Sequence, residues 1–356
     1  MNPGPVNATP RVRRALLGPD ICHREKEFSG LLGDIRARLL RIFRIEKTHT
    51  AAFFTGPGTS ALEAALVSYA GRKRKVLVLS NGVYGGRMRD ILARSGAPVR
   101  FLEAPIGRFP SSAEIESALK KDAAIEGIAV VHHETSSGAL NPLGEVARLA
   151  HKHGKVLLVD AISSLGGERI DFGRIAPDFL VGNSGKCLHG FPGVAFVLLS
   201  HRAAALVRAS EPVSVALDLR AALQNAEKGD TAFTPAVQVF YAFREALAEL
   251  EKEGLRNRVA SYKKRSTFLE KIFEGLRLDF VVKKKLRSHV LTAVWTPKGI
   301  AYEALHDRLK KEGFVIYAGQ SKLKGRIFRV ANLGDIRPAD LRRFRSALGR
   351  ALARRS

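Results

Sequence analysis

Lys186 and Asp160 are the two residues whose side chains and positions most directly suggest chemistry. Lys186 lies in VGNSGKCLHGFPG (181–193), between two apolar runs typical of buried strands. A lysine at a strand end is usually a solvated charge, but its amine can also form a Schiff base. Asp160 ends the apolar run KVLLVD (155–160). A carboxylate buried there requires a cation or hydrogen-bond donors. Its alternative role is to cap the next segment. A protonated pyridine nitrogen would be a suitable partner for it.

A glycine-rich turn supplies a candidate phosphate site. In TGPGTSALEAAL, Thr59 and Ser60 precede a helical run, and the free N–H groups at a helix start bind phosphate, although such turns are also ordinary caps. Tyr84 in SNGVYGGRM could lie flat over a planar ring or remain a surface tyrosine. Thr135 in HHETSSG offers a hydroxyl at another strand end.

Taken together, these stretches predict a site for pyridoxal phosphate. The Thr59 turn binds the phosphate and Tyr84 covers the ring. Asp160 keeps the ring nitrogen protonated, so that the ring can accept electrons from the substrate. Lys186 forms the Schiff base and, once released, moves the proton during the reaction.

The elements that must position these residues follow a repeating order. From KVLVLSNG (75–82) onward, apolar runs alternate with helical patterns. This order predicts an α/β fold whose mostly parallel sheet is covered by helices on both faces, with ligands at the C-terminal strand ends. After a long helical stretch (236–254), shorter strands mix with helices. We therefore predict an N-terminal arm (1–20), a large cofactor-binding domain (21–254) and a small α+β domain (255–356).

The composition argues against several classes of protein. The 356 residues include 59 Lys and Arg against 34 Asp and Glu, a net charge of +25. The basic residues are scattered along helical patterns without a nucleic-acid-binding motif, so we expect no dedicated nucleic-acid partner. A positive field would instead attract small anionic substrates. Because no run approaches about 18 consecutive apolar residues, we expect no membrane association.

The sequence shows no sign of secretion or of a metal site. The start MNPGPVNATP lacks the features of a signal peptide, and Cys22 and Cys187 are too few for a disulfide framework. These features predict a cytoplasmic protein. The stretch HKHGK (151–155) fits the basic end of an amphipathic helix better than a metal site, so we expect no bound metal.

An ordered set of motifs resembles the class V aminotransferases over nearly the whole chain. The motifs are NPGPVN, GPGTSALEA, NGVYGGRM, HETSSGALNPL, VDAISSLGG, NSGKCLHGFPG, FTPAVQVFYAFREALAELEKEG and IFRVANLG. The resemblance implies a pyridoxal-phosphate-dependent transferase of fold type I, with a seven-stranded sheet in its large domain. It also implies a homodimer with composite active sites.

The resemblance implies roles for individual residues. Lys186 would carry the Schiff base, and Asp160 would pair with the pyridine nitrogen. The other implied cofactor contacts are Ile162 beneath the ring, Tyr84 above it, Gly58, Thr59 and Thr135 at the family's usual positions, and Thr234 reaching the phosphate across the dimer interface. Arg329 in IFRVANLG matches the arginine that binds the substrate carboxylate; its alternative is an ordinary strand arginine.

One position departs from the family pattern. Relatives often carry Asn or Gln directly before the lysine, whereas Gly185 occupies that place here. One cofactor contact of the family is therefore either missing or supplied by another residue. The expected consequence concerns cofactor affinity rather than the reaction.

Within the class, the motifs most resemble members that transfer the amino group of 2-aminoethylphosphonate to pyruvate. The expected products are phosphonoacetaldehyde and L-alanine, and the reverse direction is equally open. The alternative is an aminotransferase for alanine or serine with glyoxylate or pyruvate. Arg24 in CHREKEF is a candidate second cation for the phosphonate, or part of a solvated charge run.

Overall fold

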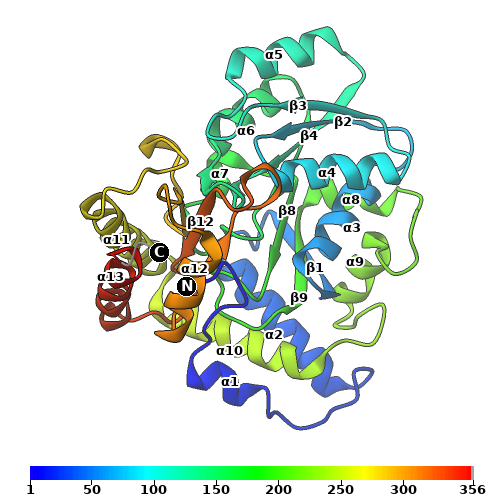
Figure 1. Ribbon diagram of the computed structural model, residues 1–356. Coiled ribbons are helices and arrows are strands. Elements are labelled where there is room, and N and C mark those ends of the chain that lie inside the picture. Colours follow the sequence, from blue (N-terminus) through cyan, green and yellow to red (C-terminus); the bar gives the residue numbers. More distant parts are fainter. Residues whose placement is uncertain (354–356) are drawn as a thin grey trace.

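A seven-stranded sheet forms the centre of the computed structural model, which describes residues 1–353 (Figure 1). In spatial order its strands are β1 (His49–Gly56), β9 (Gly193–Ser200), β8 (Phe179–Asn183), β7 (Val156–Asp160), β4 (Ile125–Val131), β2 (Lys75–Ser80) and β3 (Val99–Glu103). Strands β3, β2, β4, β7 and β8 pair in parallel, and β9 pairs antiparallel with both β8 and β1. The predicted mostly parallel sheet is confirmed.

The strands are almost continuously apolar because helices cover both faces of the sheet. One face carries α2 (Lys26–Phe43), α5 (Ser112–Lys121), α6 (Leu143–Lys152), α7 (Phe172–Ile175) and α10 (Val237–Glu253). The other face carries α3 (Gly58–Ala70), α4 (Val83–Arg94), α8 (His201–Arg208) and α9 (Leu219–Glu227).

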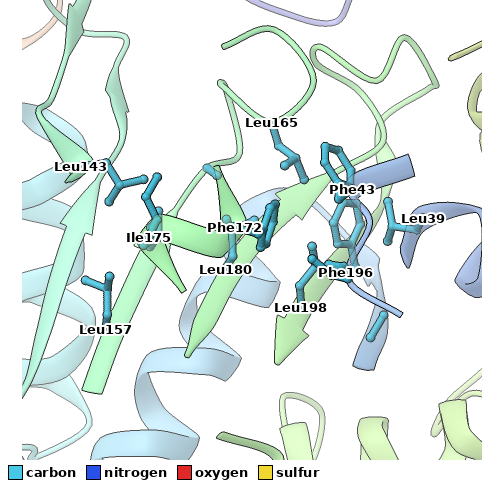
Figure 2. Close-up of a cluster of buried hydrophobic side chains, with 14 of the residues drawn as sticks. Leu39, Phe43, Leu143, Leu157, Leu165, Phe172, Ile175, Leu180, Phe196 and Leu198 are labelled. Atoms are coloured by element: carbon cyan, nitrogen blue, oxygen red, sulfur yellow. The ribbon is translucent and has the colours of Figure 1, made fainter. Parts of the chain in front are cut away.

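Alternate residues of each strand supply the two cores. In β9, Phe196 and Leu198 point to the α2 face, where Leu39 and Phe43 meet them, as Figure 2 shows. Their neighbour Val197 belongs to the core on the opposite face. Close packing on both faces holds the sheet rigid. The backbone at the strand ends therefore has a fixed position, and so do the residues that follow it.

The C-terminal part of the chain builds a second, smaller sheet with its own core. Its strands, in spatial order, are β10 (Leu291–Trp295), β12 (Ile327–Ala331) and β11 (Tyr317–Ala318), all antiparallel. The surrounding helices are α11 (Leu255–Gly275), α12 (Tyr302–Lys311) and α13 (Pro338–Ala353), with 3-10 turns at Lys284–Leu286 and Ser321–Leu323. Gly254 separates α10 from α11, but the division into domains at this point stays a prediction.

The first residues of the chain lie between the two sheets. After this segment comes α1 (Pro10–Ala15), whose Val12 packs on α10. Met1 O accepts a hydrogen bond of 2.9 Å from Ala331 N in β12, and Asn7 pairs with Gly334 just beyond that strand. A short hairpin of β5 (His133–Glu134) and β6 (Ala139–Leu140) lies beyond β4. No helix within residues 1–353 is both long enough and apolar enough to cross a membrane.

Candidate active site

The candidate site lies at the C-terminal ends of the parallel strands. Asp160 is the last residue of β7, and Lys186 follows the neighbouring β8. Tyr84 follows β2, and Thr135 follows β4. Because these strands run in parallel, all four residues emerge at one edge of the sheet, where ligands bind in open α/β folds.

Lys186 is a half-buried amine without an acidic partner. Its Nζ donates a hydrogen bond to Pro3 O, and within residues 1–353 it forms no ion pair. Burial, together with the positive charge of Arg329, lowers the pKa of the Lys186 amine, while Asp160 acts weakly in the opposite direction. A lowered pKa increases the neutral, nucleophilic form of the amine.

Asp160 is a buried carboxylate with little internal compensation. Its side chain is 4% exposed, and Oδ1 accepts a hydrogen bond of 2.9 Å from Ile162 N. Burial raises the pKa of Asp160 to about 6, and the part of the chain that the structure describes gives it no ion pair. A carboxylate in this setting is ready to stabilise a cationic ligand.

The glycine-rich turn begins α3 beside Ile162. A Cβ atom at Gly58 would lie 2.9 Å from Ile162 Cδ1, so only glycine allows this close approach without displacement of the isoleucine. Thr59 and Ser60 stand half-buried in the first helical turn, where Ser60 N donates to Pro57 O at 2.9 Å but the N–H groups of Gly58 and Thr59 have no acceptor within residues 1–353. This geometry suits an anionic group above Ile162.

Tyr84 is held by Glu134, a residue that sequence reasoning missed. Glu134 is fully buried, and its Oε2 accepts hydrogen bonds from Tyr84 N at 3.1 Å and Gly85 N at 3.3 Å. Its Oε1 accepts one of 3.2 Å from Ser136 N, while burial raises the pKa of this carboxyl. A Cβ at Gly82 would lie 2.5 Å from Glu134 Cδ. The available signal was a glutamate directly after the apolar run IAVV and two histidines, at a strand end near SNGVYGG.

Arg329 joins the small sheet to the edge of the large one. It lies in β12 with 3% exposure, and donates to Ala318 O at 2.8 Å through Nε and to Thr135 O at 2.9 Å through Nη1. Its Nη2 has no hydrogen-bond partner among residues 1–353, so that nitrogen is available to an anion. Burial lowers the pKa of Arg329, whose charge acts on Lys186.

Within residues 1–353, Arg24 and Thr234 form no hydrogen bond or ion pair with Lys186, Asp160, Tyr84 or Arg329. Arg24 Nη1 donates to Asp230 Oδ2 at 2.6 Å and to Thr231 O at 2.9 Å. Thr234 lies exposed a few residues further along, and Ala236 N donates to Thr55 Oγ1 at 3.3 Å. The segment 230–236 thus approaches the glycine-rich turn from the surface.

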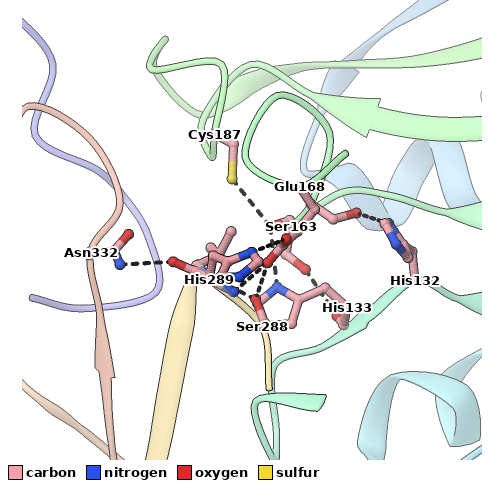
Figure 3. A network of polar contacts seen from close by, with 10 residues as sticks. His132, His133, Ser163, Glu168, Cys187, Ser288, His289 and Asn332 are labelled. Carbon is pink, nitrogen blue, oxygen red and sulfur yellow. Dashed lines mark hydrogen bonds and ion pairs between the residues drawn. The ribbon is translucent and has the colours of Figure 1, made fainter. Parts of the chain in front are cut away.

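A polar network that was not predicted links the loop after β7 to the start of β10 (Figure 3). Glu168 accepts hydrogen bonds of 2.8 Å from Ser288 Oγ and forms an ion pair of 2.8 Å with His289 Nδ1. On the same loop, Ser163 O accepts a hydrogen bond from Cys187 Sγ at 3.3 Å. Burial raises the pKa of Cys187 to about 12, which makes this thiol a packing residue rather than a nucleophile.

Comparison with known proteins identifies the family. Residues 15–333 match the model of the aminotransferase class-V family. The chain belongs to the class-V aminotransferases. It is 33% identical to a 2-aminoethylphosphonate–pyruvate transaminase of Vibrio vulnificus, over 99% of this chain and 97% of that protein. It is 34% identical to a protein of the same name from Bacillus mycoides, again over 99% and 97%.

Solved structures of other aminotransferases share the fold of this class-V aminotransferase. An aspartate aminotransferase of subgroup IV from Thermus thermophilus has a TM-score of 0.92 at 27% identity, covering 100% of this chain and 99% of that one. An alanine–glyoxylate aminotransferase from Nostoc has a TM-score of 0.93 at 30% identity, covering 99% and 94%. The predictions of fold type I and of a pyridoxal-phosphate-dependent aminotransferase are confirmed.

The residues present fit pyridoxal phosphate. Asp160 and Lys186 form no ion pair within residues 1–353; Asp160 would supply a buried carboxylate for the ring nitrogen, and Lys186 would supply the amine for the carbonyl carbon. The helix start at Gly58 offers free N–H groups for the phosphate. Gly185 contributes no side chain, and a Cβ there would lie 2.8 Å from Pro192 N and 3.0 Å from Pro192 Cα. A residue larger than glycine at position 185 would therefore require the backbone near Pro192 to move.

Proposed function

We propose that this class-V aminotransferase transfers the amino group of 2-aminoethylphosphonate to pyruvate, giving phosphonoacetaldehyde and L-alanine, or catalyses the reverse reaction. The observation that carries the proposal is the similarity of nearly the whole chain to several transaminases of that name. The buried guanidinium of Arg329, which has no acidic partner within residues 1–353, supports it, because both substrates carry an anionic group.

We assign the chemical roles as follows. Bound pyridoxal phosphate supplies an electron-accepting ring that lets a proton leave the carbon bearing the substrate amine. The Asp160 carboxylate holds the proton on the ring nitrogen. Lys186 binds the cofactor through Nζ, and its lowered pKa allows the free amine to take up the substrate proton and return it.

The other residues position the cofactor. Ile162 would support the ring from below and Tyr84 would cover it, with Glu134 fixing the backbone of Tyr84. The turn of Gly58, Thr59 and Ser60 binds the phosphate at the start of α3, and Thr135 contributes a hydroxyl. The N–H groups at the helix start and its dipole favour the dianion. A fixed ring keeps the substrate carbon close to Lys186 Nζ.

Arg329 binds the anionic group of each substrate. Its Nε and Nη1 are held by Ala318 O and Thr135 O, so the guanidinium keeps one orientation. The remaining Nη2 faces the acid group of pyruvate or alanine, and the phosphonate of the other substrate takes the same place. Arg24 is paired with Asp230, so we propose that it contacts the phosphonate only where this ion pair opens.

We further propose a cytoplasmic homodimer with composite sites. Thr234 is exposed next to Phe233, a large apolar side chain that is 53% exposed. An exposed aromatic beside a polar segment is typical of an interface, where Thr234 would reach the partner's phosphate. The free thiols of Cys22 and Cys187 suit a reducing compartment. Light scattering on the holoenzyme should give twice the chain mass; a fully active monomer would refute the composite site.

A panel of amino donors tests the substrate. The holoenzyme is mixed with 2-aminoethylphosphonate, alanine or serine, and the absorbance change of the bound cofactor is followed. We expect 2-aminoethylphosphonate to give the highest kcat/KM with pyruvate as acceptor. The alternative, suggested by the likeness to the Nostoc alanine–glyoxylate aminotransferase, predicts reaction with alanine and glyoxylate and none with the aminophosphonate.

A further inference from the structure

Arg87 places a cation between two residues assigned to the cofactor. It lies in α4, one helical turn after Tyr84, and is half-buried. Its Nη1 donates a hydrogen bond of 3.1 Å to Thr59 Oγ1. Its Cζ lies 4.7 Å from the centre of the Tyr84 ring. The guanidinium thus connects the phosphate-binding turn on α3 with the aromatic ring on α4.

The charge of Arg87 has no acidic partner in the part of the chain that the structure describes. The carboxylate on which it acts is Asp160, where burial is the dominant influence and the charge of Arg87 lowers the pKa. By contrast Arg89, two residues further along the same helix, binds Asp90 at 2.7 Å. A half-buried guanidinium without a counter-charge destabilises the folded chain, and a bound anion would remove this penalty.

The contact with Thr59 orients that hydroxyl toward the anion. A hydroxyl has one proton and two lone pairs. Because Arg87 Nη1 occupies a lone pair of Thr59 Oγ1, the proton remains free to point at a ligand at the start of α3. The loop that carries Lys186 adds no donor at Gly185, where a side chain would collide with Pro192.

We propose that Arg87 is a second anchor for the phosphate group of the cofactor, beside the turn of Gly58, Thr59 and Ser60. The guanidinium donates to the phosphate oxygens directly and fixes Thr59 for a further hydrogen bond. The same oxyanion chemistry would suit the phosphonate of the donor. The contact with the Thr59 turn favours the cofactor, since Arg329 already serves the substrate. The inference rests on the proposed arrangement of the site but not on the identity of the donor.

The test compares two ligands that differ only in the phosphate. The full chain, freed of cofactor, is titrated with pyridoxal phosphate and with pyridoxal, and binding is followed by absorbance. Arg87→Met keeps a stem of similar length against Tyr84 but removes the charge. We expect it to weaken binding of pyridoxal phosphate by about 10- to 100-fold, as for loss of a charge-assisted hydrogen bond, and to leave pyridoxal binding within about twofold. Arg89→Met is the matched control and should change neither.

Either of two results with Arg87→Met would overturn the proposal. An equal loss for both ligands would make Arg87 a structural residue only. Unchanged binding of pyridoxal phosphate with a raised KM for 2-aminoethylphosphonate alone would assign Arg87 to the substrate.

If Arg87→Met does not fold, Arg87→Lys replaces it, because lysine keeps the charge. In Arg87→Lys, inorganic phosphate should still compete with pyridoxal phosphate, but several-fold more weakly than in the natural chain. Competition of undiminished strength in Arg87→Lys would contradict a bidentate phosphate contact. A different preferred donor would refute the proposed function without affecting this comparison.

Discussion

The backbone N–H of Tyr84 donates a hydrogen bond of 3.1 Å to the side chain of Glu134, 50 positions further along the chain. The same carboxylate also accepts from Gly85 N, so it satisfies two donors at the start of α4. Glu134 therefore acts as the cap of a helix to which it does not belong. This contact between β5 and α4 fixes the backbone from which the Tyr84 ring projects.

Replacement of Glu134 with Ala should destabilise the chain and loosen the cofactor. It leaves buried N–H groups at Tyr84, Gly85 and Ser136 without acceptors, and each such group costs about 1–3 kcal/mol. Removal of the buried carboxylate offsets part of this sum, so we expect the free energy of unfolding in urea to fall by about 2–5 kcal/mol in total. Glu126→Ala, at an exposed position, is the control and should change it by less than about 0.5 kcal/mol.

Replacement of Lys186 with Ala should abolish transamination without unfolding the chain. The amine has no ion pair within residues 1–353, so its loss removes the reactive group and a single hydrogen bond, to Pro3 O. We expect kcat to fall by about 1000-fold or more in single-turnover measurements, with an unchanged circular dichroism spectrum. The exposed Lys47→Ala should keep full activity. Turnover near the natural rate in Lys186→Ala would remove this lysine from the reaction.

Asp160→Asn should make the cofactor-free chain more stable while it impairs the reaction. A carboxyl whose pKa is raised on folding favours the folded state at low pH and opposes it as the pH rises through about 6. At pH 8 the substitution should therefore raise the free energy of unfolding by about 1–3 kcal/mol, and at pH 4 by much less. Urea unfolding at both pH values provides the measurement. No pH-dependent difference would show that the charge is compensated.

The contact between Glu168 and His289 should produce a pH-dependent stability. Hydrogen bonding to Glu168 raises the pKa of His289 above its ordinary 6.5, so this stabilisation is complete below that value and is lost as the pH rises through the raised pKa. Although burial opposes ionisation of Glu168, His289 keeps the pKa of that carboxyl below 4.5. The deficit in Tm of His289→Asn should thus be largest near pH 5–6. The exposed His151→Asn is the control, and a deficit that persists unchanged at pH 9 would exclude the ion pair.

Arg329→Gln should impair both halves of the reaction. The change leaves no cation for the carboxylate of pyruvate or for the phosphonate, and we expect kcat/KM for each substrate to fall by about 100-fold. The control is Arg326→Gln, at an exposed position directly before β12. It should leave kcat/KM for both substrates unchanged. Loss of activity toward only one of the two substrates would contradict a shared anion site.

The strand-end residues could be predicted because the order of apolar runs determines their positions. A parallel sheet that is buried on both faces brings the ends of successive strands to one edge, so Asp160 and Lys186 could be placed together without any contact being known. Their roles in the reaction stay predictions. The identity of the preferred donor could come only from resemblance, because Arg329 would bind a carboxylate or a phosphonate equally well.

Other parts of the site depend on contacts that no local pattern reveals. The partners of Glu134 and Glu168 lie 50 and 121 positions away, and Arg87 meets Thr59 across 28 positions. Periodicity reports which face of an element is buried but not which distant polar group it meets there. For the same reason the sequence could not reveal the ion pair of Arg24, because its partner Asp230 lies on a loop 206 positions away.

Residues from both ends of the chain meet at Lys186, and this has a consequence for protein synthesis. Pro3 O accepts a hydrogen bond from the Lys186 amine, and the charge of Arg329 adds to burial in lowering the pKa of that amine. The first strand, β1, pairs only with β9, and residues 1–7 are anchored on β12 and the residues after it. A nascent chain still on the ribosome without β12 therefore exposes its lysine and lacks the substrate guanidinium. Capture of the cofactor in a competent site must therefore follow translation through β12.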